Sequence, residues 1–256
     1  MSGTRSIWAR VRDRSRRELS KRLARREEEV TLERPTISFT FDDFPQSALR
    51  IGGEILKENG CRGTYYASLG LMGSDFETGR IFDADDLAAL ASAGHDLGCH
   101  TYSHCHSWNT SAGMFEEALI SNRRRLEELL PGRRFRTMSY PISMPRPATK
   151  LRCAKYFACC RGGGQTFNAG VVDMNCLSAF FLEQSRDDFA AIQRVIDETC
   201  AATGWLIFAT HDVCDAPTRY GCKPDFFARV VRASVESGAR IATVEETLDC
   251  CDFAAN

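Results

Sequence analysis

The stretch Thr36–Asp43 reads TISFTFDD, an apolar run that ends in two carboxylates, Asp42 and Asp43. Runs of β-branched and aromatic residues of this length predict a buried strand. Two adjacent carboxylates at a strand end repel each other unless a cation or a proton separates them. Asp43 can also begin a helix, because Pro45 follows two residues later. The pair alone is therefore consistent with a helix cap or with a functional site.

Short β-rich runs and helical patterns alternate from this stretch to the end of the chain. Such alternation predicts a parallel sheet, which makes the fold class α/β. Seven or eight units over about 220 residues favour an irregular (β/α) barrel over an open sheet. The expected strands are Thr36–Asp43, Cys61–Ser68, Asp96–His100, Arg136–Pro141, Phe157–Gly163, Val171–Leu177, Gly204–His211 and Arg240–Thr243. The expected helices begin near Gln46, Asp83, Ser111, Arg146, Arg186 and Pro224.

The composition, 43% hydrophobic and 26% charged over 256 residues, is typical of a globular domain and excludes a disordered or fibrous chain. No apolar stretch approaches the ~20 residues that a membrane-spanning helix needs. Twelve cysteines occur, none in a CxxC pattern, and the start MSGTRSIWAR lacks the apolar core of a secretory signal. We therefore expect a cytoplasmic protein whose cysteines are reduced and mostly pack as small hydrophobic residues.

The charge is unevenly distributed along the chain. Residues 1–30 carry nine Arg and one Lys against one Asp and four Glu, a net charge of +5. The remainder carries −6, since the whole chain has a net charge of −1, and so acidic a body excludes a bulk nucleic-acid binder. We expect a basic N-terminal arm over residues 1–34 and one domain over 35–256. The arm suits peripheral membrane contact or self-association, or is simply solvated.

Four of the five histidines lie in the stretch GHDLGCHTYSHCH, residues 94–106. The i, i+4 spacing of His100 and His104 places two imidazoles on one face of a turn. Two neutral imidazoles and one carboxylate leave coordination positions open, which is the pattern of a catalytic metal site. His95 and His106 flank the pair, and we expect them to pack or to support it.

The fifth histidine, His211, ends the apolar run WLIFATHD, residues 205–212. In a (β/α) barrel the chemistry lies at the carboxyl ends of the strands. We therefore expect His211 to face the same rim as Asp42 and His100.

These motifs resemble those of the polysaccharide deacetylases, the carbohydrate esterase family 4 that includes chitooligosaccharide deacetylases. The family's first motif, TFDD, is present at residues 40–43, and its second, H[ST]xxH, is present as HTYSH at 100–104. The late histidine motif of the family fits Leu206–His211. The resemblance spans roughly Pro35 to Asp249 and implies an irregular (β/α) barrel.

The resemblance also implies roles for these side chains. Asp43, His100 and His104 would hold one divalent metal ion, Asp42 would be the general base, and His211 would protonate the leaving amine. A divalent ion lowers the pKa of its bound water to about 7, which gives a nucleophile at neutral pH. The nitrogen-rich donor set favours Zn²⁺, with Co²⁺, Ni²⁺ or Mn²⁺ as alternatives.

The third family motif is altered in this chain. The family has Arg-x-Pro followed by an aromatic residue, and the Arg pairs with the catalytic base. Here the segment is MSYPISMPRP, so Ser139 stands at the position of that Arg and Ile142 follows Pro141. In the family a backbone N–H after this motif binds the oxyanion, and Tyr140 is the residue here that we expect at the substrate or oxyanion position.

Another cation must therefore orient Asp42. Arg161, in the stretch FACCRGGG at an expected strand end, is our first choice. We predict that its guanidinium reaches hydrogen-bonding distance of Asp42, and the alternatives are Arg136 and Arg146.

The fourth motif, in which an Asp orients the acidic histidine, is also altered. Asp173 in VVDMNCL is the best-placed acid for this catalytic role. Leu177 is the candidate for the family's aromatic residue at the acetyl pocket.

These motifs, taken together, indicate an expected function. We expect a hydrolase that removes N-acetyl or related acyl groups from an amino-sugar-containing oligo- or polysaccharide, with a carbohydrate and no nucleic acid as its partner. The alternatives are a degenerate barrel that binds carbohydrate without catalysis, and a hydrolase of another C–N bond.

Overall fold

The central strand of the sheet is β2 (Thr36–Phe41), all of whose residues are buried. The computed structural model describes residues 7–142 and 144–251 of the chain. In it, eight parallel strands form a curled sheet in the order β10-β11-β2-β3-β6-β7-β8, with β12 also paired to β2. The other strands are β3 (Gly63–Ala67), β6 (Asp96–Cys99), β7 (Thr137–Ser139), β8 (Cys159–Arg161), β10 (Phe180–Phe181), β11 (Trp205–Thr210) and β12 (Arg240–Ile241).

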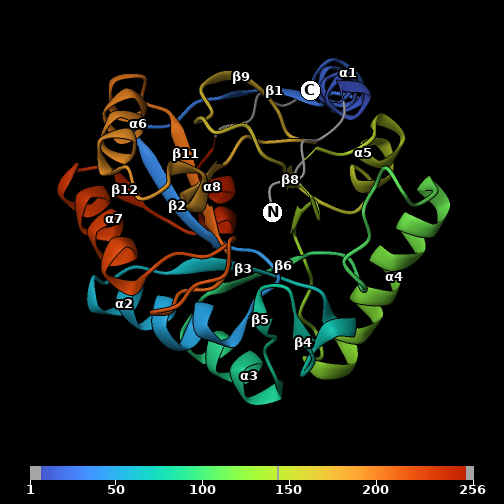
Figure 1. Ribbon diagram of the computed structural model, residues 1–256, viewed down its shortest axis with the longest axis horizontal. Coiled ribbons are helices and arrows are strands. Elements are labelled where there is room, and N and C mark those ends of the chain that lie inside the picture. The colour runs from blue at the N-terminus through green and yellow to red at the C-terminus, as the bar shows by residue number, and fades with distance from the viewer. Residues whose placement is uncertain (1–6, 143, 252–256) are drawn as a thin grey trace.

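Helices cover the outside of this sheet. Figure 1 shows α2 to α7 in an arc around the strands. The helices are α1 (Ile7–Arg22), α2 (Glu54–Glu58), α3 (Ala84–Ser92), α4 (Ala112–Leu129), α5 (Pro147–Cys153), α6 (Phe189–Ala201), α7 (Pro224–Glu236) and α8 (Val244–Cys250). A single-turn π-helix, Ala48–Gly53, precedes α2, and 3₁₀ turns lie at Leu69–Leu71 and Leu182–Ser185. The predicted α/β barrel is confirmed by this arrangement.

Several helices begin at polar residues whose side chains cap the first turn. Asp83 accepts from the backbone N–H groups of Asp85 and Asp86 and begins α3 with a capping box. Ser111 accepts from the N–H of Met114 and begins α4, where the sequence predicts that a helix begins.

The predicted strand Val171–Leu177 differs from the structure. Its first part is β9 (Gly170–Asp173), which pairs antiparallel with β1 (Glu27–Val30) outside the main sheet. The charged run of β1 carries no strand signal, so its pairing with β9 was not foreseen. The segment after β9 runs beside β8, where the Leu177 N–H donates to the Cys160 carbonyl at 2.8 Å. This segment leads into β10, so it links the two edges of the curled sheet.

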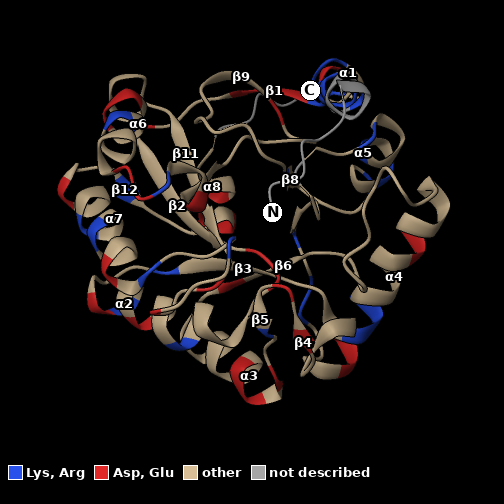
Figure 2. Ribbon diagram, in the orientation of Figure 1, with Lys and Arg blue, Asp and Glu red and all other residues tan. Residues whose placement is uncertain are grey.

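The segment predicted as an N-terminal arm is attached to the barrel within its described part. Figure 1 shows α1 and the β1–β9 ribbon across the side between α5 and α6. The buried Lys150 ammonium donates to the Ser20 carbonyl at 2.7 Å and to the Leu23 carbonyl at 2.9 Å. The Arg16 guanidinium lies 4.9 Å from the centre of the Trp108 ring. Figure 2 shows the basic residues of α1 next to the acidic residues of β1.

The twelve cysteines, all within the described residues, form no disulfide, and seven of them are buried. Between Ile7 and Cys251, apart from the undescribed residue 143, no helix combines the length and the apolar character that crossing a membrane requires. A small antiparallel hairpin, β4 (Asp75–Phe76) and β5 (Gly79–Arg80), follows β3 and rises above the carboxyl ends of the strands, where its turn lines a cavity.

Candidate metal centre

The chemistry-bearing residues gather at the carboxyl ends of three strands. Asp42 and Asp43 follow β2, His100 follows β6, and His211 follows β11. Because these strands run parallel in one sheet, their ends meet at one rim. All four side chains line a single cavity of about 880 Å³.

Asp43, His100 and His104 form a cluster at the floor of this cavity. Their ligand atoms all lie within 4.8 Å of one another. The Oδ1 atom of Asp43 is 3.4 Å from His100 Nε2 and 3.3 Å from His104 Nε2. Asp43 and His100 are buried, and the His104 side chain is 19% exposed toward the cavity. The predicted three residues are thus brought together.

Neighbouring groups hold the cluster in place. The His100 Nδ1–H donates to the Ser139 carbonyl at 2.8 Å, which leaves Nε2 free to bind a metal. The Thr78 hydroxyl donates to Asp43 Oδ2 at 3.1 Å. Asp43 and His104 both have left-handed backbone, with φ of 61° and 54°. Non-glycine residues adopt this conformation at a cost, and such strain is concentrated at functional sites.

The cluster fits a cation. The buried Oδ1 atom of Asp43 has no hydrogen-bond partner among the described residues, and such an orphaned carboxylate oxygen is costly without a counter-charge. Burial raises the pKa of Asp43, but the neighbouring His100 imidazole holds it well below its usual range. Burial lowers the pKa of His104 to about 4, which keeps this imidazole neutral and able to ligate.

Asp42 points to a different partner. The Arg161 guanidinium donates to Asp42 Oδ1, and the same Nη2 donates to the Ser139 hydroxyl at 2.7 Å. Both partners are buried, with side chains 1% and 5% exposed. Burial raises the pKa of Asp42, but the charges of Arg161, His100 and His211 and the Arg161 hydrogen bond together lower this pKa below the ordinary value. The contact predicted between the two residues is therefore present.

The alternative arginines lie elsewhere. Arg136 pairs with Asp249 at 2.7 Å and with Glu245 at 3.6 Å on the outer face. The Arg146 guanidinium donates to the Thr110 carbonyl. Neither arginine contacts Asp42.

His211 is held by the backbone and not by an acid. Its Nδ1–H donates to the Tyr220 carbonyl at 3.1 Å, and its ring stacks 6.4 Å from that of Phe181. Asp173, the predicted orienting acid, instead accepts from the Lys150 ammonium at 2.5 Å and from the Arg26 N–H at 3.0 Å. The expectation for Asp173 is therefore corrected: the pairing of β9 with β1 carries this carboxylate away from His211.

Tyr140 lines the cavity, but its hydroxyl and its backbone N–H are both already hydrogen-bonded within the protein. Its hydroxyl donates to the Asn175 carbonyl at 3.1 Å, and its backbone N–H donates to the Arg161 carbonyl at 3.0 Å. Ile142, two residues later, also lines the cavity, with a left-handed φ of 58° and a side chain 58% exposed. Leu177 is buried in a second core cluster and does not line the cavity.

The flanking histidines lie outside the cluster, as expected. His95 Nδ1 accepts from the Gly63 N–H at 3.0 Å, and burial lowers its pKa to about 4. His106 Nδ1 accepts from the Trp108 N–H at 3.3 Å.

Glu183 is a rim residue that the sequence did not reveal. It follows the two-residue strand β10 and lines the cavity, and its buried Oε2 has no partner among the described residues. Burial, aided by the negative charge of Asp42 and opposed by the charge of Arg161, raises its pKa to about 8. The only signal was its place after the apolar pair Phe180–Phe181, which is too short to predict a strand.

A polar contact spans the mouth of the cavity. The Tyr220 hydroxyl donates to Glu77 at 2.9 Å, and the Arg219 guanidinium lies 3.4 Å from the same carboxylate. Glu77 belongs to the β4–β5 turn, whereas the other two residues belong to the loop after β11. This contact joins two loops above the cluster of Asp43, His100 and His104.

A model of the polysaccharide deacetylase family matches residues 29–156. This segment holds Asp42, Asp43 and both histidines of the cluster, and it ends before Arg161. A search of the curated proteins finds no match.

Solved structures with the same fold include family 4 carbohydrate esterases. The acetyl xylan esterase of Clostridium thermocellum, in complex with a cobalt ion, is 17% identical with a TM-score of 0.58 over 84% of this chain and 90% of that one. The enzyme of Streptomyces lividans, in complex with acetate, is 15% identical with a TM-score of 0.57 over 88% and 100%. A pseudoenzyme of this family from Bacillus anthracis is 12% identical with a TM-score of 0.58 over 86% and 67%. Identities this low show the fold alone.

Proposed function

The chain belongs to the polysaccharide deacetylase family, and we propose on that basis that it is a metal-dependent hydrolase of acylated amino sugars in an oligo- or polysaccharide. The bond cleaved is the C–N bond of an N-acetyl group or of a related acyl amide. The observation that carries this proposal is the buried, unpartnered Oδ1 of Asp43, which faces the Nε2 atoms of His100 and His104.

Asp43, His100 and His104 are the proposed ligands of one divalent cation. Two imidazoles and one carboxylate suit Zn²⁺, and Co²⁺, Ni²⁺ and Mn²⁺ are the alternatives to test. A divalent cation held there lowers the pKa of a bound water toward neutrality and polarises an acyl carbonyl.

Asp42 is the proposed general base. Its lowered pKa keeps it ionised at neutral pH, so it can accept a proton from the attacking water. Arg161 acts as a positioning residue, because its guanidinium fixes the carboxylate through Oδ1 while the second oxygen stays available. It would thereby replace the arginine that the family has at the position of Ser139.

His211 is the proposed acid. Because its Nδ1–H is engaged with the Tyr220 carbonyl, Nε2 is the nitrogen that can deliver a proton to the leaving amine. The backbone N–H of Ile142 is the proposed donor to the oxyanion, since the N–H of Tyr140 is already bonded to Arg161.

Acetate release tests this proposal. The protein is stripped with a chelator, reloaded with Zn²⁺, Co²⁺, Ni²⁺ or Mn²⁺, and incubated with short chitooligosaccharides and acetylated xylan. We expect metal-dependent acetate release from an N-acetylated oligosaccharide. Release from xylan alone would assign an ester and not an amide as the substrate.

A second candidate function is carbohydrate binding without turnover. The altered third motif favours it, as does the fold shared with a family 4 pseudoenzyme. Binding of chitooligosaccharides, measured by calorimetry, without acetate release under any metal would establish this second function.

The cytoplasmic location and a membrane contact of the basic N-terminal segment stay predictions.

A further inference from the structure

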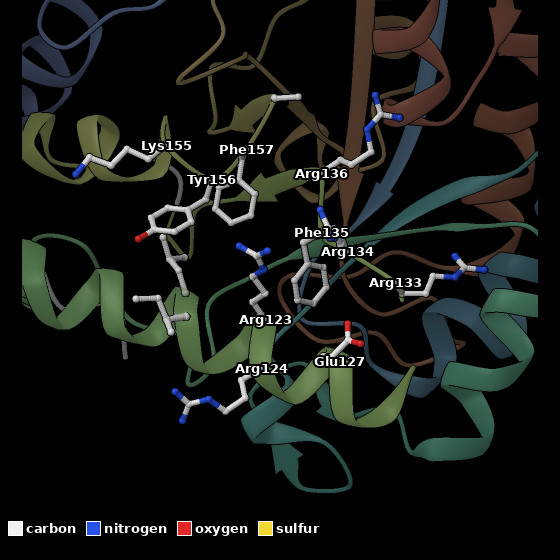
Figure 3. Close-up of a pocket in the computed structure, with 13 residues that line it drawn as sticks. Arg123, Arg124, Glu127, Arg133, Arg134, Phe135, Arg136, Lys155, Tyr156 and Phe157 are labelled. Atoms are coloured by element: carbon white, nitrogen blue, oxygen red, sulfur yellow. The ribbon is translucent and has the colours of Figure 1, made fainter. Parts of the chain in front are cut away.

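A second hollow, here called the arginine groove, lies at the end of the barrel opposite to the candidate metal centre. Its cavity volume is about 820 Å³, and none of its lining residues lines the cavity at the metal centre. Three segments form it: one face of α4, residues 133–136 before β7, and residues 155–158 before β8 (Figure 3). Since both loop segments precede their strands, the groove opens at the amino ends of β7 and β8, opposite to the rim that holds Asp43.

The groove has a large surplus of positive charge. Its cations are Arg123, Arg124, Arg133, Arg134, Arg136 and Lys155, whereas its only acidic lining residue is Glu127. Arg136 is paired with Asp249, and Lys155 lies 3.9 Å from Glu116. The other four guanidiniums have no carboxylate within 4.0 Å anywhere in the described ranges 7–142 and 144–251. Glu127 itself accepts from the Gly132 N–H at 3.1 Å.

The floor of the groove is apolar and aromatic. Leu119, Phe135 and Phe157 are buried, and they line the hollow beneath the charged side chains. Figure 3 shows the Arg123 guanidinium turned into the space between the Phe135 and Phe157 rings, while Arg124 and Arg133 extend away from it. A ligand seated here would meet a guanidinium and two aromatic rings at once.

We propose that the arginine groove binds a small organic phosphate that carries a flat apolar group, the chemistry of a nucleoside di- or triphosphate. One planar guanidinium can donate two parallel hydrogen bonds to a phosphate group. Several guanidiniums together suit a ligand that carries more than one negative charge. The parts of the Phe135 and Phe157 rings that line the hollow offer an apolar contact for a flat ring.

The size of the groove favours a small molecule over a protein partner. Its volume lies within the range of ligand pockets, about 300–1,000 Å³. A stable protein interface instead buries roughly 800 Å² on each side, over a broad and mostly flat surface. Because the groove lies at the opposite ends of the strands from Asp43, its ligand does not compete with a carbohydrate at the metal centre.

Calorimetric titration with ATP tests the proposal, with Mg²⁺ in excess and ionic strength held near that of the cell. We expect ATP to bind in the micromolar to low-millimolar range, adenosine to show no binding, and inorganic triphosphate to bind more weakly than ATP. Affinity should fall as salt is added, because charged contacts at this open groove are screened.

Arg123→Ala/Arg134→Ala should weaken ATP binding at least about tenfold, since each lost charge-assisted hydrogen bond is costly. Arg125→Ala is the matched control, because Arg125 lies on the same helix, does not line the groove, and pairs with Glu128 at 2.8 Å. Arg123 and Arg125 lie on α4, where alanine is a good helix former, and Arg134 lies in a loop. The fold should therefore survive all three substitutions.

Three results would overturn the proposal. The first is no heat of ATP binding up to several millimolar, and the second is undiminished binding in the double variant. The third is tighter binding of a hexaglutamate peptide than of ATP, which would assign the groove to an acidic protein segment. Acetate release by the double variant, measured alongside, should equal that of the parent chain.

Discussion

The guanidinium of Arg161, at the end of β8, reaches the carboxylate of Asp42, at the end of β2, although three strands separate β8 from β2 in the sheet. The pair therefore spans the inside of the barrel and does not follow the sheet. The Tyr66 and Phe181 rings lie 5.1 and 5.5 Å from the guanidinium carbon and shield it from water. Electrostatic contact in such an environment is strong, and loss of one partner leaves a buried charge.

Replacement of Arg161 by Ala should reduce turnover by about 10²-fold or more while metal content stays unchanged, because the proposed general base, Asp42, loses its positioning partner. The same change leaves Asp42 buried and unpaired, so a loss of stability of about 3–5 kcal/mol is expected as well. Arg161→Lys keeps the charge but not the planar fork, and it should retain part of both properties. Normal kcat in Arg161→Ala that is still folded by circular dichroism would exclude the positioning role.

Replacement of Asp42 by Asn should preserve the metal and remove the chemical step. An amide cannot accept the proton of the attacking water, whereas the proposed ligand Asp43 is untouched. Elemental analysis and acetate release, measured on the same sample, check this prediction. Metal loss in Asp42→Asn would show instead that Asp42 is itself a ligand.

Replacement of His104 by Ala should lower metal affinity and abolish acetate release, while the unfolding temperature in chelator stays close to that of the parent chain. The stability of the hydrophobic core should not depend on this cluster. Asp43 and His100 lie at the edge of the core, and the His104 side chain is 19% exposed. His106→Ala is the matched control from the same stretch and should keep its metal. An equal metal content in the two variants would remove His104 from the ligand set.

Glu183 should make stability depend on pH. Its pKa rises from 4.5 to about 8 on folding, so the folded chain binds this proton more tightly than the unfolded chain. The contribution to stability is therefore complete below pH 4.5 and is lost progressively as the pH rises to about 8.

Glu183→Gln carries no ionisable proton and should escape this loss. We expect its unfolding temperature to match the parent chain near pH 5 and to exceed it at pH 9, by roughly 2–4 °C for each kcal/mol that ionisation costs. Glu77→Gln, on the exposed side of the same cavity, is the control. Parallel pH profiles of Glu183→Gln and the parent chain would show that Glu183 is ionised throughout.

The meeting of Asp43, His100 and His104 was predictable because its signals are local, whereas their roles as metal ligands came from the family resemblance. TISFTFDD, HTYSH and WLIFATHD each combine an apolar run with a polar end, and parallel strands necessarily bring such ends to one rim. Arg161 was predictable for the same reason, since its stretch FACC also reads as a buried strand. Their meeting point required no knowledge of side-chain contacts.

Asp173 and Glu183 were not predictable because long-range pairing decides their positions. VVD reads as a strand end like the others, yet its partner is β1, whose sequence Glu27–Val30 reads EEEV. The sequence predicts a strand of the parallel sheet at Val171–Leu177, whereas the strand that pairs with β11 from this part of the chain is β10, which has two residues. Periodicity cannot identify a strand so short, and it cannot reveal which of two candidates joins the sheet.

The attachment of the N-terminal segment has a consequence for how the chain folds. The Arg26 N–H donates to Asp173 across 147 residues of sequence, and the Ser20 carbonyl meets Lys150 across 130. On the ribosome, α1 and β1 therefore emerge long before the residues that receive them. Contacts of such separation carry a large loop-closure cost and form late. The side of the barrel between α5 and α6 is accordingly closed late in folding, by a segment that is synthesised well before the residues it contacts.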